Sequence, residues 1–319
     1  QCLPNGIEKL KNMGRVISKT IPYGPVKFEV DGSCKRDNDT ASALLNGMNM
    51  KKDDYVSVPE LFDPISYGHC SPIDSTVAEN AVRERFETFP LPDKHEERLR
   101  RMQSVLGKGV APPLDEIPDK VATGAYLNGG SSVTSSFAEA FLMQLGNSME
   151  VAWGEITRDD VYDFLTTHIY ARGVADRVFP LISHSHTMMS NRIVQFLEDD
   201  SLGSEERANT LILVGHDGDL DALAVMFGLS WHTSPFPPNA TTPGSAIRFD
   251  LLDDIENTIQ TSILYQIFDN TMDVHTSPAW FDWLTNDCST SSICSSSTNS
   301  ATLGQIKKWL APRLDSTCE

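Results

Sequence analysis

An apolar run that leads directly into a His-Asp pair constrains the fold of this chain more than any other feature. Residues 209–215 read NTLILVG, and a continuous apolar run of this length is typical of a β-strand covered on both faces. His216 and Asp217 follow at once. Residues 219–228, DLDALAVMFG, then show helical spacing that ends at a glycine. A buried strand followed directly by a helix predicts an α/β protein.

The position of this pair predicts a binding site. Open α/β sheets bind their ligands at the carboxyl ends of their strands, which is where His216 and Asp217 stand. The free N–H groups of the next helix favour anions at the same place, phosphate above all. There His216 would donate to a phosphate oxygen, and Asp217 would protonate a leaving group if nearby negative charge raises its pKa. The alternative is that Asp217 only caps the helix and His216 only packs.

The predicted strands cluster at the two ends of the chain, and helical patterns fill the middle. Further strands are predicted at residues 26–31, 245–252 and 261–268, and helices at 39–48, 133–146 and 303–310. We therefore expect an α/β core from residues 1–70 and 208–319, with a mixed central sheet flanked by helices. Residues 71–207 form an inserted, mainly helical second domain. The 319 residues are enough for both parts.

Charge and hydropathy exclude two classes of partner. The net charge is −18 and the sequence pI is about 4.8, whereas a nucleic-acid-binding protein needs a surface that neutralises phosphates. No apolar run approaches the roughly 20 residues of a membrane span. A small anionic ligand remains compatible with this composition, because one site needs only a few local donors.

The cysteine pattern predicts disulfides in an oxidising compartment, which means a secreted or periplasmic protein. The alternative is buried thiols without partners. None of the cysteines shows the paired C-x-x-C spacing of a zinc ribbon; the six are Cys2, Cys34, Cys70, Cys288, Cys294 and Cys318. Asn38 and Asn239 stand in glycosylation sequons, which matter only in a eukaryotic secretory route.

Several segments, in order along nearly the whole chain, resemble the histidine acid phosphatases, and most closely the bacterial phytase and glucose-1-phosphatase branch. The strongest likeness is in ANTLILVGHDGDLDALAVMFGLSW followed by TTPGSAIRFDL, residues 208–231 and 241–251. Further likeness is found in LNGGSSVTSSFAEAFLMQLGN, residues 127–147, in VAWGEIT, residues 151–157, and in FDPISYGHC, residues 62–70.

The resemblance implies a reaction and the residues that perform it. In this family a phosphohistidine forms on a nucleophilic His, arginines hold the phosphoryl oxygens, and an Asp protonates the leaving oxygen, without a metal or another cofactor. By position, Asp217 would be the general acid and His216 a phosphate ligand. Arg36 lies four residues before Thr40, as in the family's second arginine motif, so it would be a second phosphate ligand. The alternative interpretation of Arg36 is a solvated charge at the start of a helix. Glu139 matches an acidic position of the family near the mouth of the pocket, where it would contact the substrate.

The matching cysteines imply two disulfides, Cys70–Cys318 and Cys288–Cys294. Cys2 and Cys34 are left over, and the resemblance does not support a bridge between them. The H-x-H of His184 and His186 would need a third ligand to hold a metal, and none stands at a useful spacing. We therefore expect no metal, and a small phosphorylated substrate or inorganic phosphate as the partner.

The nucleophile motif of the family, R-H-G-x-R-x-P, is not in this sequence. None of the eight histidines follows an Arg. Truncation or a mis-predicted gene product would explain this, and so would a natural member that lost catalysis. We favour truncation, because a lost central strand would leave neighbouring backbone groups unpaired. Whether the chain is an enzyme depends on this motif. The expected function is hydrolysis of sugar or inositol phosphates; the alternative is an inactive relative that binds a phosphate ligand or a protein.

Overall fold

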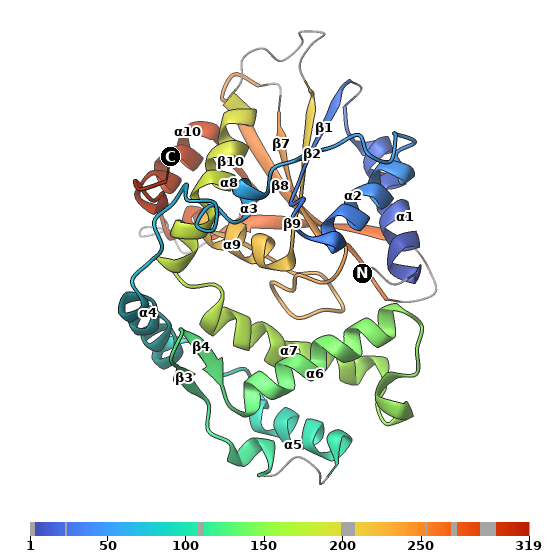
Figure 1. Ribbon diagram of the computed structural model, residues 1–319, viewed down its shortest axis with the longest axis vertical. Helices are drawn as coiled ribbons and strands as arrows, with labels where there is room; N and C mark the ends of the chain where they lie inside the picture. The colour runs from blue at the N-terminus through green and yellow to red at the C-terminus, as the bar shows by residue number, and fades with distance from the viewer. Residues whose placement is uncertain are drawn as a thin grey trace. The chain divides into compact units, whose positions relative to one another are not determined.

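The protein divides into two compact units, which are described separately. The computed structural model describes residues 4–22, 24–107, 112–198, 208–252, 254–268, 273–287 and 298–318. Unit 1 comprises Gln1–Pro72, Ser183–Trp231 and Thr241–Glu319, and unit 2 comprises Ile73–Ile182 and His232–Ala240. Figure 1 labels the helices and strands of both.

A parallel sheet of three strands positions the His-Asp pair in unit 1. Its order is β2-β1-β5, with bounds Val56–Ser57, Val26–Val30 and Thr210–Val214. β1 and β5 pair in parallel from Val26 opposite Thr210 to Val30 opposite Val214. Both strands were predicted from the sequence. Their full-length parallel pairing brings their carboxyl ends to one edge of the sheet.

The second sheet of unit 1 is antiparallel. Its order is β10-β8-β9-β6, and β7 pairs with β8 from outside this path. The bounds of its strands are Leu229–Trp231 for β6, Ala246–Leu251 for β7, Thr258–Gln266 for β8, Val274–Phe281 for β9 and Ser300–Thr302 for β10. The helices of unit 1 are α1 (Pro4–Thr20), α2 (Lys35–Gly47), α3 (Pro59–Phe62), α8 (Leu181–Glu198, its first two residues in unit 2), α9 (Asp217–Phe227) and α10 (Leu303–Leu310), with short turns at Asp282–Asp287 and Ala311–Arg313.

The two sheets share one core, although no pairing between described residues joins them. Val214 of β5 and Leu264 of β8 belong to the same buried cluster, against which Ala246 of β7 packs. Figure 1 draws β5 between β1 and β7. Within the described ranges, β5 pairs only with β1 and β7 only with β8. Among the described residues, each of these two strands therefore has one edge without a strand partner.

Burial along β5 reflects this open edge. The apolar run predicted a strand covered on both faces, but only Val214 is buried, at 5% exposure, and the other four residues of β5 are half-buried. All six residues of β7 are half-buried as well. A strand that is paired on one edge only leaves its side chains partly accessible.

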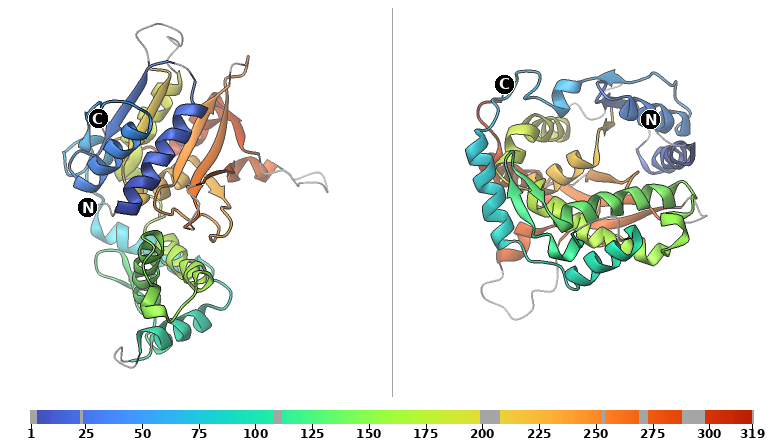
Figure 2. Two further views of the ribbon diagram at one scale, coloured as in Figure 1. Left: turned by 90° about the vertical axis from the view of Figure 1, so that its right-hand side faces the viewer. Right: turned by 60° about the horizontal axis from the view of Figure 1, so that its bottom comes forward.

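Two glycines allow α1 and α2 to pack closely beside the sheet, as Figures 1 and 2 show. A Cβ atom on Gly14 would lie 2.3 Å from the Leu44 carbonyl oxygen, and one on Gly47 would lie 1.9 Å from the Lys11 carbonyl oxygen. Any larger residue at either position would push the two helices apart.

Helix α8 groups with unit 1 almost entirely, whereas the sequence-based boundary at residue 207 placed it in the insertion. Arg192 of α8 forms a bidentate salt bridge with Glu29 of β1, with Nη2–Oε1 and Nε–Oε2 distances of 2.7 and 2.9 Å. The Asp315 amide also donates to the Thr187 hydroxyl, at 2.8 Å. Helix α8 is therefore bonded to β1 of the parallel sheet and to the segment near the carboxyl terminus.

Unit 2 is mainly helical. Its elements are α4 (Ser75–Thr88), α5 (His95–Leu106), α6 (Gly130–Gly146), α7 (Arg158–Ala175), a two-stranded ribbon of β3 (Lys120–Ala122) and β4 (Tyr126–Asn128), and short turns at Leu114–Glu116 and Val151–Gly154. The Asp119 carboxylate caps α6 by accepting from the Ser131 amide, at 3.0 Å. The predicted fold class, an α/β part and a mainly helical part, is confirmed.

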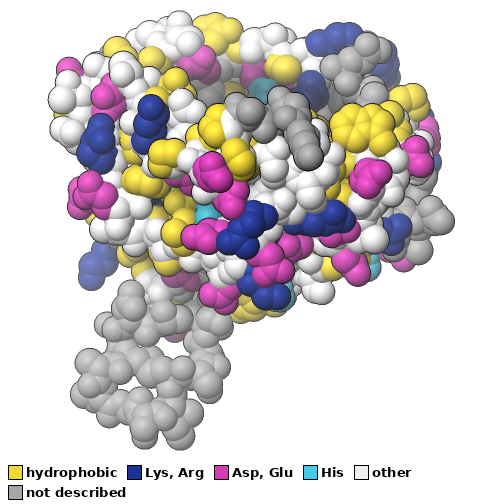
Figure 3. Space-filling model, turned by 90° about the horizontal axis from the view of Figure 1, so that it is seen from below, with side chains coloured by type: hydrophobic (Ala, Val, Ile, Leu, Met, Phe, Trp, Pro, Cys, Tyr) yellow, Lys and Arg dark blue, Asp and Glu magenta, His cyan; other side chains and the backbone are white. Residues whose placement is uncertain are grey.

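Surface charge on the face shown in Figure 3 is mixed. Lys and Arg side chains lie among Asp and Glu side chains there rather than in one broad basic patch. None of the helices in the described part of the chain is both long and apolar enough to span a membrane.

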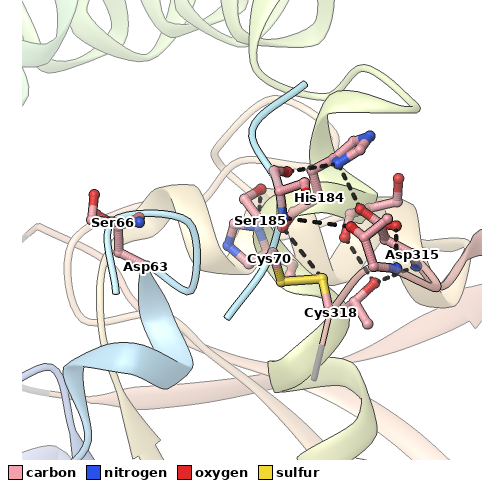
Figure 4. The surroundings of a disulfide bond; sticks show 12 residues. Asp63, Ser66, Cys70, His184, Ser185, Asp315 and Cys318 are labelled. Carbon is pink, nitrogen blue, oxygen red and sulfur yellow. Dashed lines mark hydrogen bonds and ion pairs between the residues drawn. A yellow bond between two sulfur atoms is a disulfide. The ribbon is translucent and has the colours of Figure 1, made fainter. Parts of the chain in front are cut away.

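The Cys70–Cys318 disulfide implied by the resemblance is present (Figure 4). Beside it, His184 Nδ1 lies 2.5 Å from Asp315 Oδ2 and 3.1 Å from the Ser71 carbonyl oxygen. The Cys288–Cys294 pair lies outside the described residues, as does Cys2. Cys34 carries a half-buried free thiol.

The Glu29–Arg192 salt bridge yields a stability prediction. Burial alone would raise the pKa of Glu29, but its hydrogen bonds to Arg192 and Lys27 hold the pKa below the ordinary value. Its ionised form therefore stabilises the fold above the unfolded pKa of about 4.3, and that stabilisation is lost as pH falls through the lower folded pKa. We expect Glu29→Gln to lower the free energy of unfolding by about 2–3 kcal/mol at pH 7.

Urea denaturation at neutral and acidic pH measures this difference. The gap between the wild type and Glu29→Gln should shrink as pH falls below about 4. A matched control is Glu198→Gln, because the exposed pair of Glu198 with Lys307 should contribute less than about 1 kcal/mol. A gap that stays constant with pH would contradict the assigned role of Glu29.

Candidate functional site

The loops after β1 and β5 meet at one edge of the parallel sheet. Asp31 follows β1 and His216 follows β5, and the Asp31 amide donates to the Val214 carbonyl oxygen at 3.0 Å. His216 Nδ1 lies 4.0 Å from Asp31 Oδ2. The carboxylate of Asp31 is held in place by the Ser33 amide and hydroxyl, which donate to its Oδ1 at 3.0 and 2.6 Å. Parallel pairing thus joins two sequence segments about 180 residues apart.

His216 is surrounded by carboxylates. Its Nδ1 lies 3.2 Å from Asp37 Oδ2 and 3.9 Å from Asp219 Oδ2. Asp37, in the first turn of α2, is 1% exposed. Burial raises the pKa of Asp37, while the positive charges of His216 and Arg36 act in the opposite direction. Asp37 therefore keeps its proton to a higher pH than an exposed aspartate does.

Asp219 connects the start of α9 to α8. Its Oδ2 accepts from the His216 amide at 2.6 Å, and its Oδ1 lies 3.0 Å from His186 Nε2. Gly215 makes room for this carboxylate, because a Cβ atom there would lie 2.2 Å from Asp219 Oδ2 and 2.7 Å from the Phe62 ring. The side chain that fastens the helix start is therefore Asp219.

The structure brings three of the four site residues predicted from the sequence to this edge. Arg36 Nε lies 3.8 Å from Asp37 Oδ1, so that Arg36 and His216 contact the same carboxylate group from two sides. Asp217, the first residue of α9, is half-buried next to His216. Glu139 is exposed on α6 in unit 2. The chemical roles of all four stay predictions.

The charge balance of the site limits what it binds. Four carboxylates, those of Asp31, Asp37, Asp217 and Asp219, surround or adjoin His216, and Arg36 brings the permanent positive charge seen at Asp37. This excess of negative charge favours cations, unless carboxylates are protonated or further basic groups neutralise them. Phosphate binding here therefore needs either acidic pH or added cationic side chains.

Sequence reasoning missed several contributors to this site. Asp31 and Asp37 flank Arg36 in the same segment, so their proximity to it was a usable signal. His186 contacts Asp219 from α8, and nothing in the sequence indicated this contact. The two histidines of the H-x-H diverge, since His184 pairs with Asp315 instead.

A second concave region lies within unit 2 and has a different character. It is open and is lined by Tyr162 and Thr166 of α7 and by His232, Phe236 and neighbouring prolines. None of the site residues predicted from the sequence lines it, and we assign it no role.

The hydrogen bond that caps the start of α9 allows a test of whether Asp217 has a structural role. We expect Asp219→Ala to lower the free energy of unfolding by about 1–2 kcal/mol, because it removes the acceptor of the His216 amide. Asp217→Ala should cost less, about 0.3–1 kcal/mol, the size of a carboxylate's interaction with the helix dipole. Urea denaturation of the two variants at pH 7 compares them. A larger cost for Asp217→Ala would mean that Asp217 is a structural cap.

Comparison with known proteins identifies the fold. No protein-family profile and no curated protein sequence matches the chain. Among solved structures, the phytase of Hafnia alvei in complex with myo-inositol hexakis sulphate is similar, with a TM-score of 0.81 and 21% identity over 100% of this chain and 88% of that one.

Two further phytases give the same result. The Citrobacter braakii enzyme has a TM-score of 0.77 and 21% identity, over 99% of this chain and 89% of that one. The Klebsiella sp. ASR1 enzyme has a TM-score of 0.78 and 14% identity, over 99% and 86%. The resemblance seen in the sequence is confirmed for the fold: the chain has the fold of the bacterial phytases.

Proposed function

We propose that this chain belongs to a histidine acid phosphatase, an enzyme that hydrolyses phosphomonoesters through a phosphohistidine. The observation that carries the proposal is the meeting of His216, Asp217 and Arg36 where β1 and β5 end, in a chain with a phytase fold. These are the residue types that phosphoryl transfer without a metal requires: fixed donors for the phosphoryl oxygens and a proton donor for the leaving oxygen.

Each residue has a distinct role in this reaction. His216 and Arg36 hold the equatorial phosphoryl oxygens, on which charge is spread in the transition state. A nucleophilic His attacks phosphorus and forms the nitrogen–phosphorus bond. As the bond from phosphorus to the ester oxygen breaks, Asp217, at the same helix start, gives its proton to that oxygen. Water then hydrolyses the phosphohistidine, releasing inorganic phosphate. Glu139 would contact the substrate rather than the phosphoryl group.

The nucleophile belongs on a strand beside β5. The second edge of β5 has no strand partner in the described part of the chain, and β7 also has an open edge. Exposed edges of this kind accept a further strand through main-chain hydrogen bonds. A strand with R-H-G-x-R-x-P at its carboxyl end would bring a His and two Arg to the four carboxylates. It would thereby supply the positive charge that the site lacks.

Acidic pH and an oxidising compartment suit this assignment. As pH falls, carboxylates are neutralised, and Asp37 takes up its proton at a higher pH than an exposed aspartate does because burial raises its pKa. The site then repels phosphate less, so we expect activity to be highest at acidic pH. The Cys70–Cys318 disulfide is compatible with a secreted or periplasmic location.

Inositol phosphates and sugar phosphates are the proposed substrates. The Hafnia alvei phytase structure holds myo-inositol hexakis sulphate, in which sulphate groups take the place of phosphates. The fold is common to enzymes named for phytate, and the roles of His216, Arg36 and Asp217 concern only the phosphoryl group and the leaving oxygen. The choice among phosphomonoesters depends on the rest of the pocket.

A direct test compares the 319-residue chain with a version extended by a strand carrying R-H-G-x-R-x-P. We expect no turnover of p-nitrophenyl phosphate by the 319 residues alone and clear turnover by the extended chain. An extended chain in which the motif His is replaced by Ala is the control. Turnover by the unextended chain would contradict the placement of the nucleophile. An inactive extended chain that phosphate still stabilises would indicate the non-catalytic relative.

Leaving-group dependence tests the assignment of Asp217. In the extended chain, Asp217→Asn should lower turnover of sugar or inositol phosphates by about 10²–10⁴-fold. The loss on p-nitrophenyl phosphate should be much smaller, because p-nitrophenolate hardly needs a proton to leave. Equal losses on both substrates would remove Asp217 from the role of proton donor.

Arg36 should behave differently. Arg36→Ala should weaken turnover of both substrate types alike, since it acts on the phosphoryl group that they share. Lys35→Ala is the matched control, because the neighbouring Lys35 pairs with Asp39 on the exposed side of α2. Steady-state kinetics of the variants with both substrates gives the comparison.

A further inference from the structure

A thiol, a buried carboxylate and an imidazole lie together at the same sheet edge. The Cys34 sulfur, an Asp37 carboxylate oxygen and a His216 ring nitrogen are all within 4.8 Å of one another. Cys34 and Asp37 come from the start of α2, and His216 comes from the loop after β5. Positions 34, 37 and 216 form no metal motif in the sequence, which is why the sequence predicted no metal there.

One atom of this group is unsatisfied. Asp37 Oδ2 is fully buried and has no hydrogen-bond partner. Its neighbour is His216 Nδ1 at 3.2 Å, in a geometry that forms no hydrogen bond. A buried carboxylate oxygen without a partner is costly, and a cation that binds it removes that cost.

The donor set fits zinc in chemistry and in spacing. We propose that Cys34, Asp37 and His216 bind Zn²⁺, with the fourth tetrahedral position left to water or to Asp31, whose Oδ2 lies 4.0 Å from His216 Nδ1. Thiolate, imidazole and carboxylate are the ligands that zinc takes in proteins. Their bond lengths of about 2.0–2.3 Å place the ligand atoms of one zinc about 3.3–3.7 Å apart. The Asp37–His216 distance already matches, and the sulfur needs a shift on the order of 1 Å.

The local charge supports a cation. Asp31, Asp37 and Asp219 lie within 4.0 Å of His216 Nδ1, so a divalent ion would meet an excess of negative charge. This zinc site does not depend on phosphatase activity. If the proposed function also holds, zinc would occupy His216 and inhibit the enzyme.

Cobalt(II) provides a visible probe of the site in the 319-residue chain. With thiols kept reduced by a phosphine, we expect Co²⁺ to give a sulfur-to-cobalt charge-transfer band that Zn²⁺ then abolishes. Cys34→Ser should eliminate the band, and Asp37→Asn and His216→Gln should each weaken Zn²⁺ binding at least about 10-fold. Competition with a chromophoric zinc chelator measures these affinities.

Matched controls separate the site from other donors on the chain. Asp39→Asn changes a carboxylate on the same helix that pairs with Lys35, and His275→Gln changes a histidine on β9; both should bind zinc like the wild type. A charge-transfer band that persists in Cys34→Ser, or zinc affinity unchanged in Asp37→Asn and His216→Gln, would overturn the proposal. Because the readout is metal binding, the result is independent of whether the extended chain hydrolyses phosphate.

Discussion

The parallel pairing of β1 with β5 is the constraint on which the site depends. It aligns Val30 with Val214, so Asp31 and His216, the next residue but one after β5, reach the same sheet edge. Every further contact of the site starts from this pairing: α2 brings Asp37 and Arg36 after β1, and α9 brings Asp217 and Asp219 after β5. A slip of one residue would turn the side chains of β5 to the opposite face and separate these groups.

The electrostatics of this edge determine which ligands it favours. His216 lies among Asp31, Asp37 and Asp219, and Arg36 Nε lies 3.8 Å from Asp37 Oδ1. Such a site suits a cation, and it suits phosphate only when basic groups are added or carboxylates are protonated. In the described part of the chain one edge of β5 has no strand partner, and a strand paired there with basic residues at its end would add such groups.

The sequence predicted the local elements better than their assembly. Periodicity predicted β1, α6 and α9, and a continuous apolar run predicted β5. Gly228 ends α9 in the left-handed conformation that a glycine stop implies. The short strands β6 and β10 carry too few residues for a periodic signal. The contact of His186 with Asp219 and the proximity of Cys34 to His216 join segments far apart in sequence, so only the fold reveals them. His216 and Asp217 were predicted from their position between a buried strand and a helix, and Arg36 from the motif resemblance.

A crystal structure of the extended chain with tungstate, an oxyanion that imitates phosphate, tests the central claim most directly. We expect the added strand to pair with the free edge of β5, and tungstate to be bound by the motif His, Arg36 and His216, with Asp217 facing one oxygen. A strand paired elsewhere, or tungstate bound away from the carboxyl ends of β1 and β5, would contradict it.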